Sequence, residues 1–195
     1  MGAPAVSPLV IGCGVLEPEL RRLAAAGGPG FDLALLPAAL HLDPDRLARA
    51  LGAQLARTAS LDARVFYGVC HPGLERLVQA HGRRRIRGLN CVEMLLGAAR
   101  YREELEAGSY FLLEAWAQGF EAALVRTFGG LALAAEVFQG AHTRLLAIRT
   151  PCSGDFSAAA EAASRAVGLP LAWTTVELDH LAAVLRELLA PEGVP

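Results

Sequence analysis

The sequence predicts an α/β fold with an open, mainly parallel sheet and helices on both of its faces, a Rossmann-like three-layer arrangement. Segments with a strand pattern alternate with segments of helical pattern along almost the whole chain. The strand segments are continuous apolar runs, which are typical of parallel strands buried on both faces. Of the 195 residues, 53% are hydrophobic, enough for a substantial core, so we expect a single domain over 1–195.

Six apolar runs are the predicted strands, and helical segments follow most of them. The strands are expected at 9–12, 31–36, 63–67, 85–89, 142–148 and 171–175. Helices are expected at 17–26, 44–55, 72–80, 157–167 and 181–189. Asp43 before Pro44 is a typical helix start, with an N-cap side chain and a proline at the first helical position. One extra helical block, at about 91–138, breaks the alternation and is expected to cap or flank the sheet.

The composition excludes several classes of function. The chain contains no lysine, and all 18 of its cations are arginines, so a phosphate-binding loop lysine and a Schiff-base lysine are both excluded. With a net charge of -2 and 19% charged residues, the chain is not expected to bind nucleic acid. No apolar run approaches the roughly 18 residues of a membrane-spanning helix, so no membrane association is expected.

The four cysteines are expected to be thiols or metal ligands rather than disulfides. A domain of this size does not need disulfides for stability, and no basic leader precedes an apolar segment. We therefore expect a cytoplasmic protein whose cysteines stay reduced.

Cysteines and a histidine follow successive predicted strands. Cys13 follows the first strand, His41 the second, Cys70 the third, Cys91 the fourth and Cys152 the fifth. The carboxyl ends of parallel strands share one edge of a sheet, and ligands bind at that edge in doubly wound folds. Each cysteine taken alone can equally be a small core residue. Four packing cysteines, however, have no reason to share an edge, so the sequence predicts a joint site.

The spacing of the cysteines indicates which metals such a site suits. The chain has no Cys-x-x-Cys motif, so a zinc ribbon and a thioredoxin-type motif are excluded. Three thiolates with an optional histidine suit zinc and leave one position for water or substrate. Three thiolates also suit an iron–sulfur cluster with one unusual ligand. Zinc and an iron–sulfur cluster both stay open as the cofactor.

Candidate acid–base groups lie beside these cysteines. Cys91 begins a predicted helix after Asn90, a good N-cap, and a helix N-terminus is expected to lower a thiol pKa. Glu93 lies in the same first turn, as a general base, a ligand or an ordinary acidic residue of that turn. His41 is a candidate catalytic group or ligand, and His71 is a weaker one.

Glycines near the cysteines are the candidate cofactor-binding positions. Gly12 and Gly14 flank Cys13, and Gly68 precedes Cys70, so the backbone can approach a ligand there. The Gly12-x-Gly14 pair lacks the third glycine of the dinucleotide fingerprint and is weak evidence for a nucleotide. The arginine-rich run at 83–87 suits an anionic substrate, although a solvated charge run is the commoner explanation.

Four motifs in one order resemble a bacterial and archaeal family known as domain-of-unknown-function family 1638. They are Gly12-Cys13-Gly14, Leu36-Pro37-x-x-Leu40-His41, Tyr67-Gly68-x-Cys70 and Cys91-x-Glu93-x-x-x-Gly97. The resemblance spans nearly the whole chain and implies that Cys13, Cys70, Cys91 and Glu93 match positions typical of the family. Cys152 and His71 depart from that pattern. The resemblance also implies a link to corrinoid-dependent methyl transfer, and thus to one-carbon or metallocofactor metabolism.

Three functions are compatible with the sequence. The first is a metal–thiolate protein, an enzyme or an accessory protein, with Cys13, Cys70 and Cys91 as ligands and Cys152 as a fourth candidate. The second is a metal-free enzyme with Cys91 as its nucleophile. The third is a Rossmann-like module that binds a small ligand without catalysis. The expected partner is a small-molecule substrate or a metallocofactor, and a homo-oligomer stays open.

Overall fold

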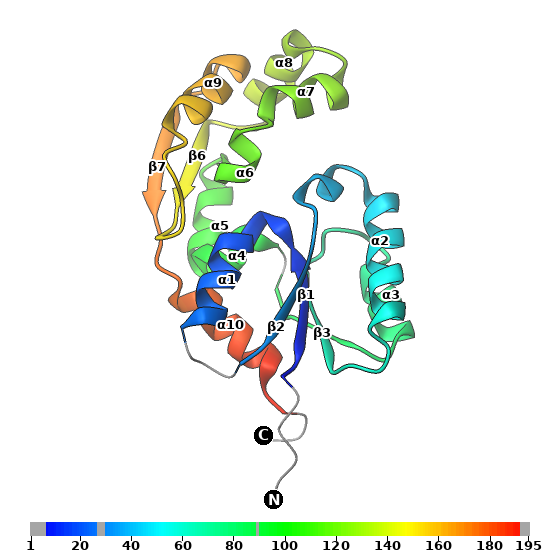
Figure 1. The fold of residues 1–195 in the computed structure, drawn as a ribbon. Helices are drawn as coiled ribbons and strands as arrows, with labels where there is room; N and C mark the ends of the chain where they lie inside the picture. Colours follow the sequence, from blue (N-terminus) through cyan, green and yellow to red (C-terminus); the bar gives the residue numbers. More distant parts are fainter. Residues whose placement is uncertain (1–6, 27–29, 89, 192–195) are drawn as a thin grey trace, which may run out of the picture. The chain divides into compact units, whose positions relative to one another are not determined.

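The computed structural model describes residues 7–26, 30–88 and 90–191, and it confirms the α/β class with parallel sheets (Figure 1). Every strand pairing in the described residues is parallel. The chain divides into two compact units, Met1–Met94 with Asp179–Pro195, and Leu95–Leu178. The prediction of a single domain stays a prediction, and each unit is described by itself.

The first unit contains a four-stranded sheet in the order β2-β1-β3-β4. Its strands are β1 Leu9–Cys13, β2 Asp32–Leu36, β3 Ala63–Phe66 and β4 Arg84–Arg85. Its helical elements are η1 Gly14–Leu16, α1 Glu17–Ala25, η2 Ala38–Leu42, α2 Pro44–Arg57, α3 Leu74–Ala80 and α10 Asp179–Leu189. The helix α4 Cys91–Leu96 begins in this unit, and its last residues belong to the second unit. Asp43 caps α2 as predicted, because its carboxylate accepts a hydrogen bond from the Arg46 amide at 3.0 Å.

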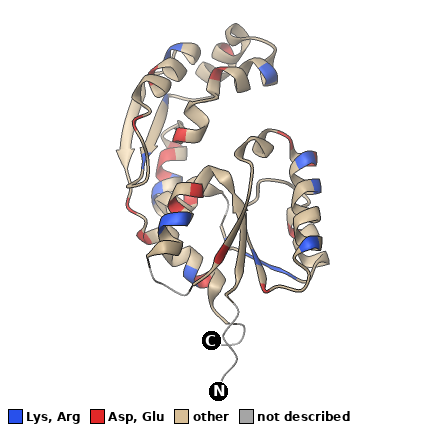
Figure 2. Cartoon of the chain, in the orientation of Figure 1, with Lys and Arg blue, Asp and Glu red and all other residues tan. Residues whose placement is uncertain are grey.

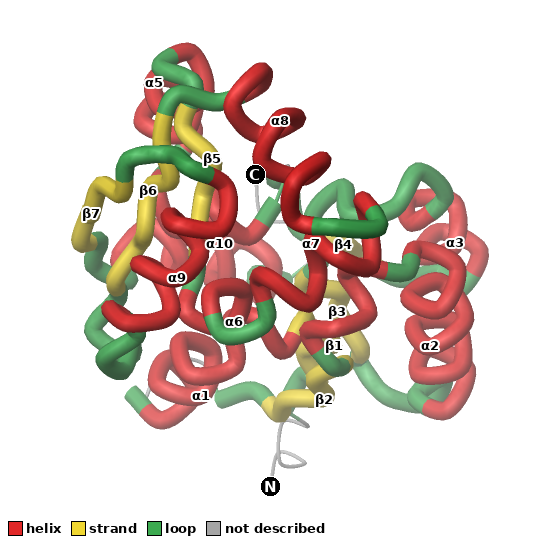
Figure 3. The backbone as a smooth tube through the Cα atoms, turned by 90° about the horizontal axis from the view of Figure 1, so that it is seen from above, coloured by secondary structure: helices red, strands yellow, loops and turns green. Residues whose placement is uncertain are grey.

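Helices cover both faces of this sheet, as the three-layer prediction requires. The helices α2 and α3 lie on one face, and α1 and α10 lie on the other (Figures 1 and 3). The face under α2 and α3 buries an aliphatic cluster that includes Ile11, Val65 and Leu51. Burial of such side chains is the main stabilising term for each layer, at about 1.5–3 kcal/mol for each side chain.

The predicted arginine run of 83–87 binds backbone carbonyls within its own unit. Arg83 donates to the Ala59 carbonyl at 2.6 Å, just after α2, and Arg84 donates to the Ala190 carbonyl at 2.7 Å, just after α10. Carbonyls at helix ends lack partners inside the helix, so these guanidinium groups satisfy them. At least these two arginines therefore have a structural role.

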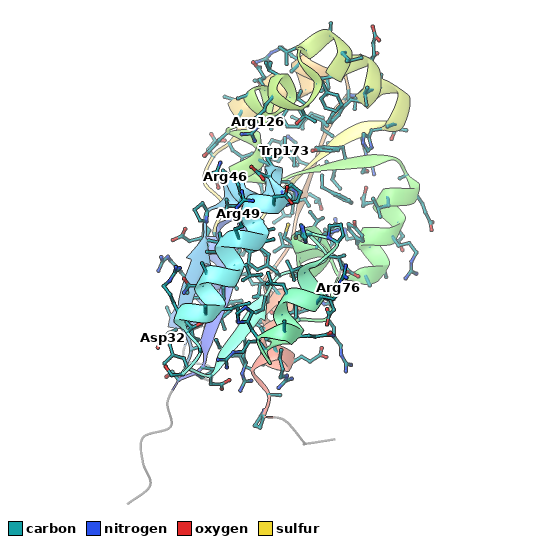
Figure 4. All side chains as sticks on the ribbon, turned by 90° about the vertical axis from the view of Figure 1, so that its right-hand side faces the viewer. Asp32, Arg46, Arg49, Arg76, Arg126 and Trp173 are labelled. Carbon is teal, nitrogen blue, oxygen red and sulfur yellow. The ribbon has the colours of Figure 1, made fainter. Side chains whose placement is uncertain are left out.

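Basic residues of the first unit lie on several elements rather than on one. In Figure 2 they are visible on α1, on α2 and on β4. Figure 4 shows Arg46 and Arg49 projecting from α2 and Arg76 projecting from α3. The prediction that nucleic acid is not a partner stays a prediction.

The second unit contains a three-stranded sheet in the order β5-β6-β7. Its strands are β5 Ser109–Leu112, β6 Arg144–Arg149 and β7 Leu171–Thr175. Its helices are α5 Ala98–Glu106, α6 Glu114–Ala117, α7 Phe120–Phe128, α8 Leu131–Ala141 and α9 Ser157–Val167. A buried cluster in this unit joins side chains of α6, α7, α8 and α9 to Leu112, Leu145 and Ala147 of the strands.

Three details of the predicted fold are wrong. The strands form two sheets rather than one, so the six predicted strands do not share a single edge. The helical block at 91–138 is also interrupted by β5, a strand that the helical pattern hid. Gly108 ends the preceding helix with a φ of +78°, which favours glycine, and a Cβ there would lie 2.9 Å from the Thr143 side chain. The fourth strand, expected at 85–89, is instead Arg84–Arg85, and residue 89 lies outside the described residues.

Candidate functional site

Three cysteines follow three strands of the first sheet at its carboxyl edge. Cys13 is the last residue of β1 and pairs in register with Leu36 at the end of β2. Cys70 lies in the loop between β3 and α3, and Cys91 is the first residue of α4, after β4. The sequence prediction therefore places these three residues correctly relative to their strands.

The sulfur atoms of these residues influence one another. Burial raises the pKa of the Cys70 thiol, and the neighbouring Cys13 raises it further. Burial also raises the pKa of the Cys91 thiol, with added contributions from Cys13 and Cys70. Cys13 and Cys70 pack against the same buried cluster, and Cys91 follows the neighbouring strand β4 at the same edge of the sheet. We call Cys13, Cys70 and Cys91 the thiol cluster.

Backbone amides face each sulfur of the thiol cluster. The Val15 backbone lowers the pKa of Cys13, and the Gly68 backbone lowers the pKa of Cys70. The amides of Cys91 and Val92 face the Cys91 sulfur. Each of these contacts lowers the pKa of its thiol, although burial outweighs it in every case. Amides that point at sulfur stabilise thiolates, including metal-bound ones.

Tyr67 lies among these cysteines and is a site residue that the sequence analysis missed. Its side chain is 2% exposed, in the apolar cluster against which Cys13 and Cys70 also pack. Burial raises the pKa of its hydroxyl, and Cys13 and Cys70 raise it further. The hydroxyl is close enough to Cys13 to lower the pKa of that thiol. It nevertheless has no partner at full hydrogen-bond geometry, so the contact with sulfur is a loose one.

The start of α4 confirms one prediction about Cys91 and contradicts another. The Asn90 side chain caps the helix, because its oxygen accepts hydrogen bonds from the Val92 and Glu93 amides at 3.0 Å each. The expected lowering of the Cys91 pKa is wrong, since burial raises the pKa more than the amides lower it. In the absence of a metal, Cys91 is a neutral thiol at ordinary pH.

The two predicted acid–base groups have different settings. Glu93 lies in the first turn of α4, and its carboxylate lies beside Gly88, 3.8 Å from where a Cβ on that glycine would be. His41 lies in η2, after β2, and is exposed as a whole. Partial burial of its imidazole lowers its pKa, which keeps the ring neutral at pH 7. Their catalytic roles stay predictions.

The glycines near the thiol cluster allow close packing of the chain. A Cβ on Gly14 would lie 3.0 Å from the Leu36 carbonyl oxygen, so the turn after β1 abuts the end of β2. A Cβ on Gly12 would lie 3.3 Å from the Leu35 side chain. Gly68 provides its amide to Cys70. Close packing explains Gly12 and Gly14, and a cofactor-binding role for the three glycines stays a prediction.

The loop that carries Cys70 is held by two further residues. His71 accepts a hydrogen bond from the Gly73 amide at its Nδ1 atom, at 2.8 Å. This bond places the proton of the neutral ring on Nε2, which is then unsuited to bind a metal without losing the loop contact. Arg85 donates to the Tyr67 carbonyl at 3.1 Å, and its charge partly lowers the pKa of Cys70.

Cys152 belongs to the second unit. It lies in the turn after β6, half-buried, and its amide donates to the Thr150 hydroxyl at 3.1 Å. The prediction that Cys152 joins the other cysteines assumes that all strands share one sheet. Since β6 is part of the second sheet, that reason no longer holds for Cys152.

Two absences concern the described residues alone. Across 7–26, 30–88 and 90–191, no group of three or more His, Cys, Asp and Glu side chains has the arrangement of a metal site. Within the same ranges, none of the helices has the length and apolar character needed to cross a bilayer. All four cysteines are free.

Comparisons with known proteins provide a family assignment. The NocB thioesterase domain, solved as a covalent complex with a fluorophosphonate nocardicin G analog, has 15% identity and a TM-score of 0.32, with 96% of each chain covered. No conclusion about this chain rests on a likeness at that TM-score. A comparison with curated proteins found no match. A family model described as "Protein of unknown function (DUF1638)" matches residues 35–185. Because this match covers more than half of the chain, the protein belongs to the DUF1638 family, as the four sequence motifs predicted.

Proposed function

We propose that the protein is a metal–thiolate protein in which Cys13, Cys70 and Cys91 bind zinc or an iron–sulfur cluster. The observation that carries this proposal is the position of three thiols, from three separate chain segments, at the carboxyl edge of one parallel sheet. Thiolate is the ligand that these metals prefer, and ligation replaces the thiol proton by the metal. Three mutually repelling thiolates are costly without a cation, and a metal removes that cost.

The thiol cluster has to close around the metal when it binds. The described side chains are not arranged to ligate one ion in the present conformation. Cysteine side chains reorient by a single χ1 rotation, and the backbone amides that face the sulfurs stay in place during such a rotation. Metal binding would therefore need side-chain movement at the ends of the strands, with the strands themselves unchanged.

The raised thiol pKa values favour this proposal over a metal-free cysteine nucleophile. A nucleophilic cysteine needs a large thiolate fraction near pH 7, which a lowered pKa provides. Burial instead raises the pKa of Cys13, Cys70 and Cys91. A metal ion overcomes this cost directly, because a coordinated thiol is deprotonated by the ion itself.

Three protein ligands on zinc leave a fourth position for a substrate, which is the arrangement of catalytic zinc sites. A thiol substrate bound there would be activated as a nucleophile for alkylation. Glu93 and His41 are the proposed acid–base groups for that step. This step would belong to one-carbon chemistry or to the handling of a metallocofactor. The four free cysteines favour a reducing compartment such as the cytoplasm.

The test is metal and acid-labile sulfide analysis of protein purified without oxygen. We expect either about one zinc per chain or iron with sulfide, in line with a single three-thiolate site. The variants Cys13→Ser, Cys70→Ser and Cys91→Ser should each lose the metal. The matched control, Cys152→Ser, should keep it.

Two results would contradict the proposal. One is folded wild-type protein without metal, both as purified and after incubation with zinc or with iron and sulfide. The other is full metal content in all three cluster variants. Rapid alkylation of one thiol that disappears in Cys91→Ala would instead support the nucleophile, and ligand binding that survives all three substitutions would support a plain binding module.

A further inference from the structure

Tyr67 has a buried hydroxyl without a full hydrogen bond. The residue directly follows β3, and its side chain is 98% buried, given its 2% exposed fraction. Among the buried side-chain atoms of the described residues, this hydroxyl is one of a few without a partner. Arg83 also has such an atom, but its other two nitrogens donate to three carbonyls. The side chain of Tyr67 has a single polar atom, the hydroxyl oxygen, and that atom lacks a partner.

The hydrophobic cluster that holds Tyr67 is aliphatic except for sulfur. Tyr67 belongs to a buried cluster with residues such as Ile11, Leu36 and Val65. Cys13 and Cys70 pack against the same cluster, and its remaining side chains are aliphatic. Within this cluster, the sulfur atoms are therefore the side-chain groups that can accept a hydrogen bond from the phenol.

The strength of such a bond depends on the state of the sulfur. A neutral thiol is a weak acceptor, so the hydroxyl remains nearly unsatisfied while Cys13 is protonated. A thiolate is a charged acceptor, and a bond to it is roughly twice as strong as one between neutral groups. The unsatisfied hydroxyl therefore favours whichever state places negative charge on the neighbouring sulfur.

We propose that Tyr67 is a positioning residue that donates its hydroxyl proton in a hydrogen bond to the Cys13 sulfur when that sulfur binds metal. This inference rests on the proposed metal–thiolate function. The phenol keeps its proton throughout and is not a proton donor to substrate. Hydrogen bonds to ligand sulfur tune affinity and redox potential in metal–thiolate sites, and their loss typically costs about 10–100-fold in metal affinity.

Tyr67→Phe should have effects of opposite sign in the two states of the protein. In the metal-free protein, the substitution removes a buried polar atom without a partner, so the melting temperature should stay the same or rise. In the metal-bound protein, it removes a bond to charged sulfur, so affinity should fall. A residue that serves packing alone would not separate the two effects in this way.

The experiment compares wild type, Tyr67→Phe and a control, Tyr110→Phe. Tyr110 is a second, partly buried tyrosine, packed against Phe138 in the second unit. The probes are Zn²⁺, measured by competition with a chromophoric chelator, and Co²⁺, measured by the sulfur-to-cobalt charge-transfer band. We expect Tyr67→Phe to bind Zn²⁺ at least about tenfold more weakly and to shift the cobalt band. Tyr110→Phe should match wild type in both.

Each contrary result has a distinct meaning. If Tyr67→Phe binds Zn²⁺ as tightly as wild type with an unchanged cobalt band, the inference about Tyr67 fails and the metal site stands. If affinity and metal-free melting temperature fall together, Tyr67 serves packing and the inference also fails. If wild type itself binds neither ion, the proposed function fails, and the inference fails with it.

Discussion

The two sheets of the molecule end in different ways at their carboxyl edges. In the second unit, the loop after β6 hydrogen-bonds to its own neighbours. The Thr150 amide donates to the Ser153 hydroxyl at 3.0 Å, and the Gly154 amide donates to the Glu114 carboxylate at 2.9 Å. In the first unit, the corresponding edge presents three coupled thiols and a buried hydroxyl without a full partner.

In the second unit, the polar groups of the loop after β6 hydrogen-bond within the chain. In the first unit, the polar groups of the site need a ligand before they are all satisfied. Buried polar groups without partners are costly, so they are retained where some other state of the protein satisfies them. The loop after β6 satisfies its polar groups within the chain. On the proposed account, the sulfurs of the thiol cluster become negatively charged when they bind metal, and the Tyr67 hydroxyl then has a charged acceptor.

The largest expected effects come from a cavity in either core. Ile11→Ala and Leu145→Ala each remove a fully buried side chain, and each should lower the free energy of unfolding by about 2–5 kcal/mol in denaturant titrations. Ile11 shares its cluster with Tyr67, so its loss should also accelerate alkylation of Cys13 and Cys70. Leu145 lies in the other cluster and should leave those rates unchanged. Equally accelerated alkylation of Cys13 and Cys70 in both variants would contradict the distinction between the two units.

The metal-free protein should lose stability at alkaline pH because of the thiol cluster. The folded pKa of each of its thiols is raised above the ordinary value of 9.0. The associated stability is therefore complete below pH 9 and is lost as pH rises through the folded pKa values. The free energy of unfolding should fall by up to about 1.4 kcal/mol per pH unit for each thiol that ionises only when unfolded.

Urea titrations between pH 8 and 11 measure this slope, and the chain has no lysine to obscure it. The triple variant with alanine at Cys13, Cys70 and Cys91 should show a flatter dependence. An equally steep dependence in that variant would show that the slope has another origin, such as Tyr67.

A smaller effect is expected from the polar network of the second unit. Arg144 donates to Glu104 at 2.6 Å and to Ser109 at 2.8 Å, which joins α5 to β5 and β6. Burial by itself raises the pKa of Glu104, but hydrogen bonds from Ser109 and Arg144 outweigh it and the pKa is lowered. Glu104→Gln should cost about 1–3 kcal/mol at pH 7.

The loss of stability in Glu104→Gln should become smaller at acid pH. Since the folded pKa of Glu104 is lowered, its stability is present above the ordinary pKa of 4.5 and is lost as pH falls through the folded value. Thermal melts at pH 7 and pH 3 check this dependence. A difference between the variant and wild type that is independent of pH would contradict the assignment.

The smallest expected effect concerns the self-contained loop. Ser153→Ala removes the acceptor of the Thr150 amide and should cost about 0.5–1.5 kcal/mol. It should leave metal content unchanged, which elemental analysis checks. Loss of metal in this variant would mean that the edge of the second sheet belongs to the site, contrary to the comparison.

The sequence predicts the parts of the site that depend on local pattern. Cys13 and Cys70 lie at the ends of apolar runs that are strands, Cys91 follows the short strand Arg84–Arg85, and Asn90 caps the helix that Cys91 begins. These features follow from residues adjacent in the chain. The division into two sheets does not, because a parallel strand pairs with partners distant in sequence and its apolar run fits either sheet.

Tyr67 and the Cys91 pKa show why the rest of the site escaped prediction. The pattern places Tyr67 at the end of a buried strand, but which groups its hydroxyl reaches depends on tertiary packing. For Cys91, the helix N-terminus and burial have opposite effects on the pKa, and the degree of burial is not a local property. The strand β5 was hidden because its short apolar run lies between two helices.

Protection of the four thiols from alkylation by bound metal tests the central claim most directly. Cleavage after arginine places the cysteines on separate peptides, 1–21, 65–76, 88–100 and 150–165, so mass spectrometry measures each thiol individually. With Zn²⁺ bound, we expect protection of Cys13, Cys70 and Cys91 and free alkylation of Cys152, with all four reactive after chelation and unfolding. Equal labelling of the three cluster thiols with and without Zn²⁺ would contradict the metal–thiolate account.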